Sequence, residues 1–317
     1  MAALYEELQF VVPRFSGYRQ RPAKAGHYEL YKAIMPYPTR NLSPFLLAPA
    51  SAFGKSVCRL GIASRGDSQP MPEDIHFAIE GGVNFLNWCG CGYEDGMSQA
   101  ISELGAKRNE VVVCVQFEAR TAPEAKRELT SILKTLNSDY LDVLTFYYVE
   151  QASEWQKIIA VGGALEYCRQ AQKDGIVRKL GVTTHQRPLA AIMAQSGLLD
   201  CLMIRYNAAH RGAETEIFPI TTAIPMPVIS YTALRWGALL QSTPDDPPGF
   251  SVPKAPMWYR FALQSPAVTV VLAAPANRRE LEEDLTTLDA SGPLSSSECE
   301  QLAEHGQRVR RHAGSFP

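Results

Sequence analysis

The chain of 317 residues has 46% hydrophobic and 20% charged side chains and a formal net charge of −2. This composition excludes a disordered polymer, and the lack of a basic surplus excludes nucleic-acid binding driven by counterion release. No apolar run approaches the roughly 18 residues that cross a bilayer, and the acidic first residues do not form a secretory signal. The seven scattered cysteines suit reduced thiols, so we expect a cytoplasmic protein.

Residues 1–56 are rich in proline and aromatic side chains and show little hydrophobic periodicity. A disordered tail would contain fewer aromatic residues, so we expect an ordered extension that wraps the domain following it. Two placements stay open for this extension: a plug at the bottom of that domain, or a lid over its catalytic face.

From residue 57 onward, short apolar runs alternate with amphipathic stretches. The predicted strands are Leu60–Ala63, Asn84–Asn87, Val111–Val115, Val143–Tyr147, Lys179–Thr183, Leu202–Arg205, Val228–Tyr231 and Val268–Leu272. The clearest predicted helices are Pro72–Gly81, Gly96–Leu104, Ala122–Leu136, Leu165–Asp174, Pro188–Ala194 and Arg278–Leu288. This alternation favours a single (β/α)8 barrel over residues 57–317. An open doubly wound sheet would carry a glycine fingerprint after its first strand, which Leu60–Gly66 lacks.

Polar side chains stand at the predicted carboxyl ends of the strands, where such barrels carry their active sites. They are Asn87, Gln116, Tyr147, Tyr148, Thr183, Thr184, Arg205, Tyr206, Asn207, Tyr231 and Thr232. Each residue alone is equally well explained as a helix cap or a partner of loop backbone. The complete ring of amides, phenols and hydroxyls nevertheless predicts a functional site at one mouth of the barrel.

Several of these segments, taken in chain order, resemble the motifs of the aldo-keto reductases. The segments are Gly82–Asn87, Asp139–Leu144, Lys179–Thr184, Arg205–Asn207, Ile229–Leu234 and Val268–Asp284. The resemblance implies a (β/α)8 barrel that binds NADP(H) and a small-molecule substrate. That family reduces carbonyl groups with an Asp, a Tyr, a Lys and a His.

Carried over residue by residue, the resemblance places Asn87 at the Asp position, Gln116 at the Lys position and Tyr147 at the His position. Tyr93 falls within one residue of the position of the catalytic Tyr. These four are the candidate catalytic residues, and three of them are neutral replacements. Because each ends or follows one of three adjacent strands, we expect their side chains to converge on one pocket at the mouth. A Tyr without a neighbouring cation keeps a pKa near its ordinary value of about 10. We therefore expect a non-standard active site with a changed mechanism and poor reduction of generic aldehydes.

The resemblance also assigns the cofactor-binding positions. Tyr231 would stack on nicotinamide, and Thr183 and Thr184 would face the carboxamide, whereas Met203 replaces a Gln that binds it in the family. The phosphates would lie on the loops after the last two strands, at Thr232, Leu234, Arg278 and Arg279. For the two arginines, solvated positions in the first turn of a helix are an equal alternative.

Cysteines and histidines near the strand ends leave further alternatives open. Cys89 and Cys91 would be a metal site, a reactive thiol pair or, as we expect, small packing residues, because structural zinc spacing is absent. His185 and His210 each follow a strand end, and either one would supply the base that the catalytic set lacks.

The sequence thus predicts an NADP(H)-dependent oxidoreductase that acts on an unidentified carbonyl compound or alcohol. The alternatives on the same barrel are a pseudoenzyme, a nucleotide-sensing binding protein, and a cofactor-free isomerase or dehydratase. We expect no nucleic-acid or membrane partner, and the oligomeric state stays open.

Overall fold

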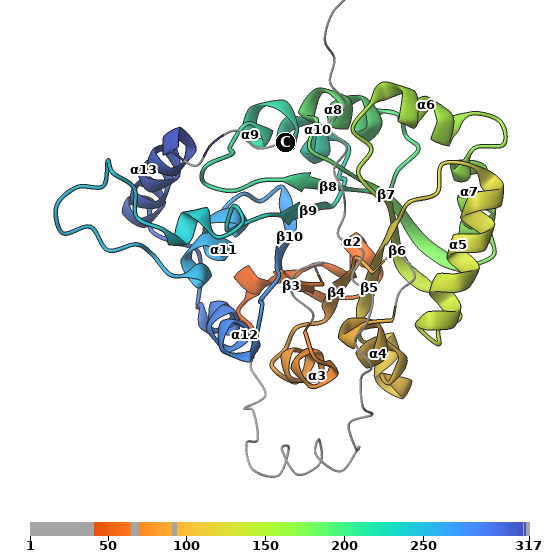
Figure 1. The fold of residues 1–317 in the computed structure, drawn as a ribbon, viewed down its shortest axis with the longest axis horizontal. Helices are drawn as coiled ribbons and strands as arrows, with labels where there is room; N and C mark the ends of the chain where they lie inside the picture. The colour runs from red at the N-terminus through yellow and green to blue at the C-terminus, as the bar shows by residue number, and fades with distance from the viewer. Residues whose placement is uncertain (1–40, 65–69, 91–93, 313, 315–317) are drawn as a thin grey trace, which may run out of the picture. The chain divides into compact units, whose positions relative to one another are not determined.

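The computed structural model describes residues 41–64, 70–90, 94–312 and 314. In this part of the chain, eight parallel strands form a closed barrel in chain order, and β10 pairs with β3 to complete it. Figure 1 shows the strands at the centre, surrounded by helices. The barrel strands are β3 (Leu60–Ala63), β4 (Phe85–Trp88), β5 (Val112–Phe117), β6 (Leu141–Phe146), β7 (Val177–Thr184), β8 (Cys201–Arg205), β9 (Val228–Tyr231) and β10 (Val268–Ala273).

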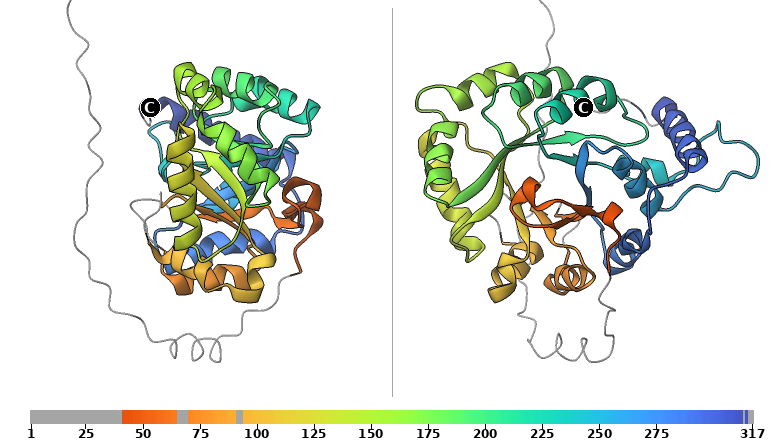
Figure 2. Two further views of the ribbon diagram at one scale, coloured as in Figure 1. Left: turned by 90° about the vertical axis from the view of Figure 1, so that its right-hand side faces the viewer. Right: turned by 180° about the vertical axis from the view of Figure 1, so that it is seen from behind.

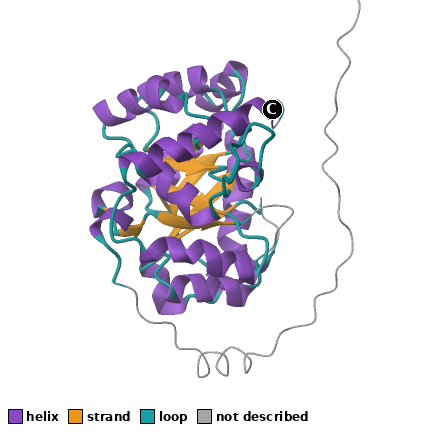
Figure 3. Ribbon diagram, turned by 90° about the vertical axis from the view of Figure 1, so that its left-hand side faces the viewer, coloured by secondary structure: helices purple, strands orange, loops and turns teal. Residues whose placement is uncertain are grey.

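Helices cover the outer face of the barrel, as the views in Figures 2 and 3 show. The α-helices are α2 (Ala50–Phe53), α3 (Pro72–Glu80), α4 (Gly96–Ser102), α5 (Ala122–Thr135), α6 (Ala152–Ile159), α7 (Ala164–Lys173), α8 (Arg187–Gln195), α9 (Ala213–Glu216), α10 (Phe218–Ala223), α11 (Ala255–Leu263), α12 (Arg278–Leu285) and α13 (Ser296–His312). Short 3-10 helices are η1 (Pro44–Leu46), η2 (Gly105–Asn109), η3 (Ala238–Leu240) and η4 (Thr286–Asp289). No helix of the described residues is both long and apolar enough to cross a membrane.

The predicted barrel is confirmed, and the predicted strands lie within a few residues of the observed ones. Parallel strands of a barrel are covered on both faces, so they carry continuous apolar runs; β5 and β6 are buried along their whole lengths. One boundary prediction was wrong in an informative way. The fourth barrel strand ends at Phe146 rather than Tyr147, because Tyr148 adopts a left-handed conformation with φ of 48° that turns the chain away from the sheet.

Residues 41–56 close the bottom of the barrel, where the strands begin. β1 (Leu47–Ala48) and β2 (Val57–Cys58) form an antiparallel hairpin around α2. From α2, the ring of Phe53 packs 5.3 Å from that of Phe85 at the start of β4. We call residues 41–56 the plug. Residues 1–40 lie outside the described residues, so the placement and the extent of the whole extension over residues 1–56 stay predictions.

A buried carboxylate fastens this plug to the barrel. Asp142 on β6 contacts Lys55 Nζ at 3.0 Å, Arg108 at 2.7 Å and Arg178 at 2.9 Å. It also accepts a hydrogen bond of 3.0 Å from the backbone N–H of Val113. Burial lowers the pKa of Lys55 although the carboxylate opposes this shift. Removing the carboxylate would leave three cations without their shared partner, a type of change that costs about 3–5 kcal/mol.

On the outer face, Asp284 of α12 is a buried acid that has no cationic partner among the residues that the structure describes. Its side chain is 3% exposed, and burial raises its pKa to about 8, with Glu280 and Glu283 adding to the shift and a hydrogen bond from Tyr259 opposing it. The folded protein therefore holds a proton here that the unfolded chain releases at lower pH.

This raised pKa predicts a stability that falls as pH rises. An acid whose pKa is higher in the folded state makes the free energy of unfolding decrease with pH between the two pKa values. For Asp284 this window runs from the ordinary value of 3.8 to about 8. Asp284→Asn should remove the decline, so between about pH 5 and pH 8 its melting temperature should fall several degrees less than that of the wild type. Glu282→Gln, at an exposed position of the same helix, is the control; an equal decline in all three proteins would contradict the prediction.

Candidate functional site

A buried amide lies at the centre of the barrel. Gln116 on β5 donates hydrogen bonds from Nε2 to Asn87 Oδ1 at 3.1 Å and to Met203 Sδ at 3.1 Å. Its Oε1 accepts from the hydroxyls of Thr145 at 3.0 Å and Thr183 at 2.9 Å. Both amide hydrogens and both lone pairs are therefore used, and four neighbouring strands contribute the partners.

This Gln116 network is neutral and excludes water. Asn87 and Gln116 are each 2% exposed, as is Thr183, and Thr145 is fully buried. A buried ion without a partner would be strongly destabilising in such surroundings. The two candidate catalytic positions on β4 and β5 are thus in direct contact, as the sequence predicted, but their contact is between amides.

The Gln116 network continues toward the loop after β4. Asn87 Nδ2 lies 3.0 Å from Cys89 Sγ, and the backbone N–H of Cys89 donates to Ser64 Oγ at 2.9 Å. Burial raises the pKa of Cys89 to about 12, so its thiol stays protonated and is a poor nucleophile. No cluster of potential metal ligands occurs among the described residues, while Cys91 and the candidate Tyr93 lie outside them.

Tyr147 belongs to a second group, a row of aromatic rings along the mouth. Its ring packs against Tyr148 at 4.2 Å, Tyr148 lies 4.8 Å from His185, and His185 lies 5.4 Å from Tyr231. Three strand ends contribute to the row, because Tyr147 follows β6, His185 follows β7 and Tyr231 ends β9. The predicted convergence of Tyr147 with Asn87 and Gln116 stays a prediction.

Glu150 is a site residue that the sequence analysis did not single out. Glu150 Oε1 accepts a hydrogen bond of 2.8 Å from the backbone N–H of His185 and lies 3.2 Å from Nδ1 of its ring. Burial would raise the pKa of Glu150, but the hydrogen bonds from His185 outweigh it and lower the pKa. The sequence did contain a signal for Glu150, because it is the first acidic residue after the fourth strand, four residues beyond Phe146.

Some of the predicted cofactor-binding residues use their polar groups in hydrogen bonds within the chain, and others have a polar group left for a ligand. The hydroxyl of Thr183 is turned to Gln116 and Met203, whereas Thr184 Oγ1 accepts from the backbone of Gln186 at 3.1 Å and retains its own hydrogen. Tyr231 donates to the carbonyl of Thr184 at 3.0 Å.

Thr232 adopts a left-handed φ of 51°, and its hydroxyl is buried without a hydrogen-bond partner in the described chain. Leu234 is partly buried in the loop that follows β9.

The two arginines at the start of α12 differ in their surroundings. Arg278 contacts Asp74 on α3 at 2.7 Å and stacks 4.0 Å over the ring of Phe77. Arg279 is exposed and makes no ion pair with any residue that the structure describes. Arg278 thus joins two helices, while Arg279 is the one available to a ligand.

His210, the other candidate base, lies in a cluster of cations after β8. Its Nε2 lies 3.0 Å from Nε of the buried Arg235, which makes that ring nitrogen the acceptor. Burial lowers the pKa of His210 to about 4, and Arg205 and Arg235 contribute to the shift. The imidazole is therefore neutral at pH 7, and its lone pair is already in use.

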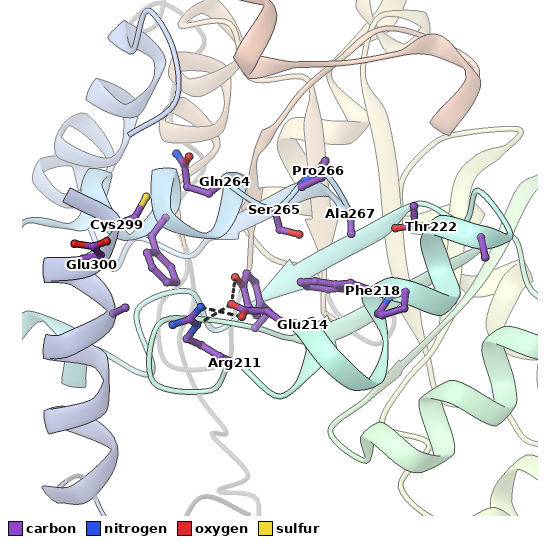
Figure 4. Close-up of a pocket in the computed structure, with 15 residues that line it drawn as sticks. Arg211, Glu214, Phe218, Thr222, Gln264, Ser265, Pro266, Ala267, Cys299 and Glu300 are labelled. Carbon is purple, nitrogen blue, oxygen red and sulfur yellow. Dashed lines mark hydrogen bonds and ion pairs between the residues drawn. The ribbon is translucent and has the colours of Figure 1, made fainter. Parts of the chain in front are cut away.

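A pocket of about 690 Å³ lies away from this mouth, on the outer face of the barrel. It is lined by residues of α10, α11 and α13 and of the segment before β10. Figure 4 shows the ion pair of Arg211 and Glu214 beside Phe218. Of the predicted strand-end residues only Tyr206 lines this pocket, and none of the candidate catalytic or cofactor-binding residues does.

Comparison with known proteins agrees with the barrel fold. Residues 63–255 match the aldo/keto reductase family. This chain belongs to that family. A search of curated proteins found no match.

Solved structures of aldo-keto reductases share the fold at low sequence identity. One from Klebsiella pneumoniae in complex with NADPH has 16% identity and a TM-score of 0.65, covering 84% of this chain and 95% of its own. The holo form of one from Bacillus halodurans has 15% identity and a TM-score of 0.64, covering 80% and 93%. A glycerol dehydrogenase from Gluconobacter oxydans has 13% identity and a TM-score of 0.63, covering 86% and 98%.

The contact between Asn87 and Gln116 predicts strong coupling between charges introduced there. Asn87→Asp alone or Gln116→Lys alone would bury one unpaired ion and should cost about 3–5 kcal/mol in the free energy of unfolding. The double variant forms an ion pair, so its cost should fall short of the sum by on the order of 1–3 kcal/mol. Urea denaturation measures all four proteins.

The control combines Asn87→Asp with Gln170→Lys, at an exposed position on α7; that pair should be additive within about 0.5 kcal/mol. Additive costs for Asn87 and Gln116 would contradict the contact.

Proposed function

We propose that this aldo/keto reductase is an NADP(H)-dependent oxidoreductase with a non-standard active site, acting on a small carbonyl compound or alcohol. The observation that carries the proposal is the placement of Tyr231 at the end of β9, within the row of rings at the mouth. The family resemblance assigns nicotinamide stacking to this position. Similar reductases from Klebsiella pneumoniae were solved with NADPH and with NADP.

The residues of the mouth fit such a cofactor best at its phosphates. The buried hydroxyl of Thr232 lacks a partner among described residues, and such groups are rarely left unsatisfied. Arg279 is exposed at the first turn of α12, beside the loop expected to bind the adenosine phosphate. Arg278 would act by holding α12 against α3, Leu234 would line the loop, and Thr184 retains a hydrogen to donate to the carboxamide. Bound NADP(H) would supply or accept the hydride, and the residues of this chain would handle the proton.

The catalytic set proposed here is Asn87, Gln116, Tyr147 and Tyr93, with the amides in place of the family's ionised pair. Asn87 would position a substrate oxygen or a phenol through the Nδ2 hydrogen that Cys89 does not take, and Gln116, whose hydrogen bonds are all used, would hold Asn87 in place. Neither amide would lower the pKa of the phenol, because the amides bring no charge. General acid catalysis contributes about 10²–10⁴-fold in rate. We therefore expect slow reduction of aldehydes that ordinary members of the family reduce readily.

A second candidate function, a nucleotide-sensing or hydride-inactive barrel, is favoured by one observation. Thr183 and Met203, two of the positions that bind the carboxamide in the family, are tied to Gln116 instead. Fewer donors would then hold the nicotinamide, which weakens the case for hydride transfer but not for nucleotide binding. A cytoplasmic location stays a prediction from the sequence.

The cofactor assignment predicts losses of NADPH affinity. Tyr231→Ala removes the stacking ring and Arg279→Ala removes the phosphate partner, and each should raise the Kd for NADPH by roughly ten-fold. Quenching or enhancement of NADPH fluorescence on titration measures the Kd. Arg127→Ala, at an exposed position on α5, should leave it unchanged. Absence of NADPH binding by the wild type, or an unchanged Kd in both variants, would show that the assignment is wrong.

The catalytic assignment predicts that the family's charges restore ordinary activity. The triple variant Asn87→Asp, Gln116→Lys and Tyr147→His should reduce 4-nitrobenzaldehyde faster than the wild type or any single variant, because such sets act as a unit. Steady-state oxidation of NADPH measures the rate. Rapid turnover by the wild type that Tyr93→Phe abolishes would contradict the changed mechanism.

A further inference from the structure

A histidine and a glutamate form a polarised pair at the mouth, outside the catalytic set described above. Glu150 Oε1 lies 3.2 Å from His185 Nδ1 and accepts the backbone N–H of the same residue at 2.8 Å. Because an ionised carboxylate only accepts hydrogen bonds, Nδ1 must carry the hydrogen. In a neutral imidazole this tautomer leaves the lone pair on Nε2.

The Nε2 atom of His185 is open to a substrate. The only polar contact of the ring within the described chain is at Nδ1. The His185 side chain is 7% exposed, and Nε2 is the ring nitrogen that reaches the surface. The ring lies between Tyr148 at 4.8 Å and Tyr231 at 5.4 Å, so the imidazole neighbours the ring that is proposed to stack on nicotinamide.

The other titratable groups around the ring are poor proton acceptors. Burial raises the pKa of Tyr148 and of Tyr231, so both phenols keep their protons at neutral pH. Arg205 stays a cation although burial lowers its pKa. Glu150 is ionised but turned to His185, and the lone pair of His210 is occupied by Arg235.

We propose that His185 and Glu150 are a proton-accepting dyad, in which His185 Nε2 takes the hydroxyl proton of an alcohol substrate bound at the mouth. The proposal rests on the proposed function for the reaction that follows. His185 is the catalytic residue, and Glu150 is a positioning residue that fixes the tautomer and stabilises the imidazolium. The dyad performs, from β7, the proton transfer that the neutral amides at Asn87 and Gln116 do not support.

In this proton transfer, the O–H bond of the alcohol breaks and its proton moves to Nε2, while the electron pair of that bond forms the second bond of the carbonyl group. The C–H bond breaks with its electron pair and leaves as hydride, which bound oxidised NADP would accept. In the opposite direction, the imidazolium returns the proton to the carbonyl oxygen as the hydride arrives.

A hydroxyl probe that reports its own ionisation tests the dyad without hydride transfer. 4-Nitrophenol is added to the full-length protein at about one pH unit below the pKa of the free phenol, where its phenolate absorbance is weak. The wild type should bind it as the phenolate, which absorbs near the visible range. His185→Gln should reduce the bound phenolate by at least about ten-fold, and Glu150→Gln should reduce it by less.

His76→Gln is the matched control, because His76 forms a similar pair with Glu103 at 3.1 Å on the outer helices. It should leave the phenolate signal unchanged. Circular dichroism verifies folding, and if His185→Gln is unfolded, Glu150→Gln, which retains the imidazole, is decisive instead. The ¹⁵N shifts of the His185 ring add a second measurement, with hydrogen expected on Nδ1.

Three results would overturn the dyad. The first is no bound phenolate with the wild type, and the second is a phenolate signal in His185→Gln equal to that of the wild type, which would assign the effect to Arg205. The third is a loss of signal in His76→Gln as large as that in His185→Gln. Titration of the wild type with NADPH tests the proposed function separately. A protein that ionises the probe but does not bind NADPH would retain the proton acceptor and refute the oxidoreductase.

Discussion

The amide of Gln116 is the interaction on which the interior of the mouth depends. It is buried on the barrel axis, and its partners come from β4, β6, β7 and β8. A buried amide is tolerated only when its hydrogen-bonding capacity is used, and here the partners are two threonine hydroxyls, an amide oxygen and a thioether. These residues therefore constrain one another, and Thr183 cannot leave Gln116 for a cofactor without an energetic cost.

Charge is distributed unevenly between the two ends of the barrel. At the bottom, Asp142 holds three cations and the backbone of Val113, which joins the plug to the strands. On the axis, the Gln116 network is neutral, and at the mouth arginines gather around His210. An anionic ligand is therefore favoured at the mouth, where its charge meets cations in a partly buried setting.

The barrel was predictable from the sequence because buried parallel strands consist of consecutive apolar residues, and eight such runs alternate with helices. The contact between Asn87 and Gln116 was predictable too, since neighbouring strands of a barrel end at one mouth. The aromatic row was not, because it depends on the left-handed turn at Tyr148, and a tyrosine in that conformation has no sequence signature. Glu150 and His185 lie 35 residues apart in the sequence. The tautomer with hydrogen on Nδ1 follows only from the distance between Glu150 Oε1 and that nitrogen.

Neutral residues stand at Asn87 and Gln116, where the family has an ionised pair, and a histidine–carboxylate pair follows β7. The two features are related, because the first creates a need for a proton acceptor that the second would meet. Were only one member of an ionised pair replaced, the other would be a buried ion without a partner, and the barrel would be destabilised. Replacing both gives a stable neutral axis, but it removes the cation that would activate a phenol. Proton transfer then requires a group with an unoccupied lone pair. The proposed Nδ1–H tautomer of His185 would supply one at Nε2, whereas His210 and the buried phenols do not. The chemistry of this mouth is therefore expected to lie nearer β7 and β9 than the loop after β4.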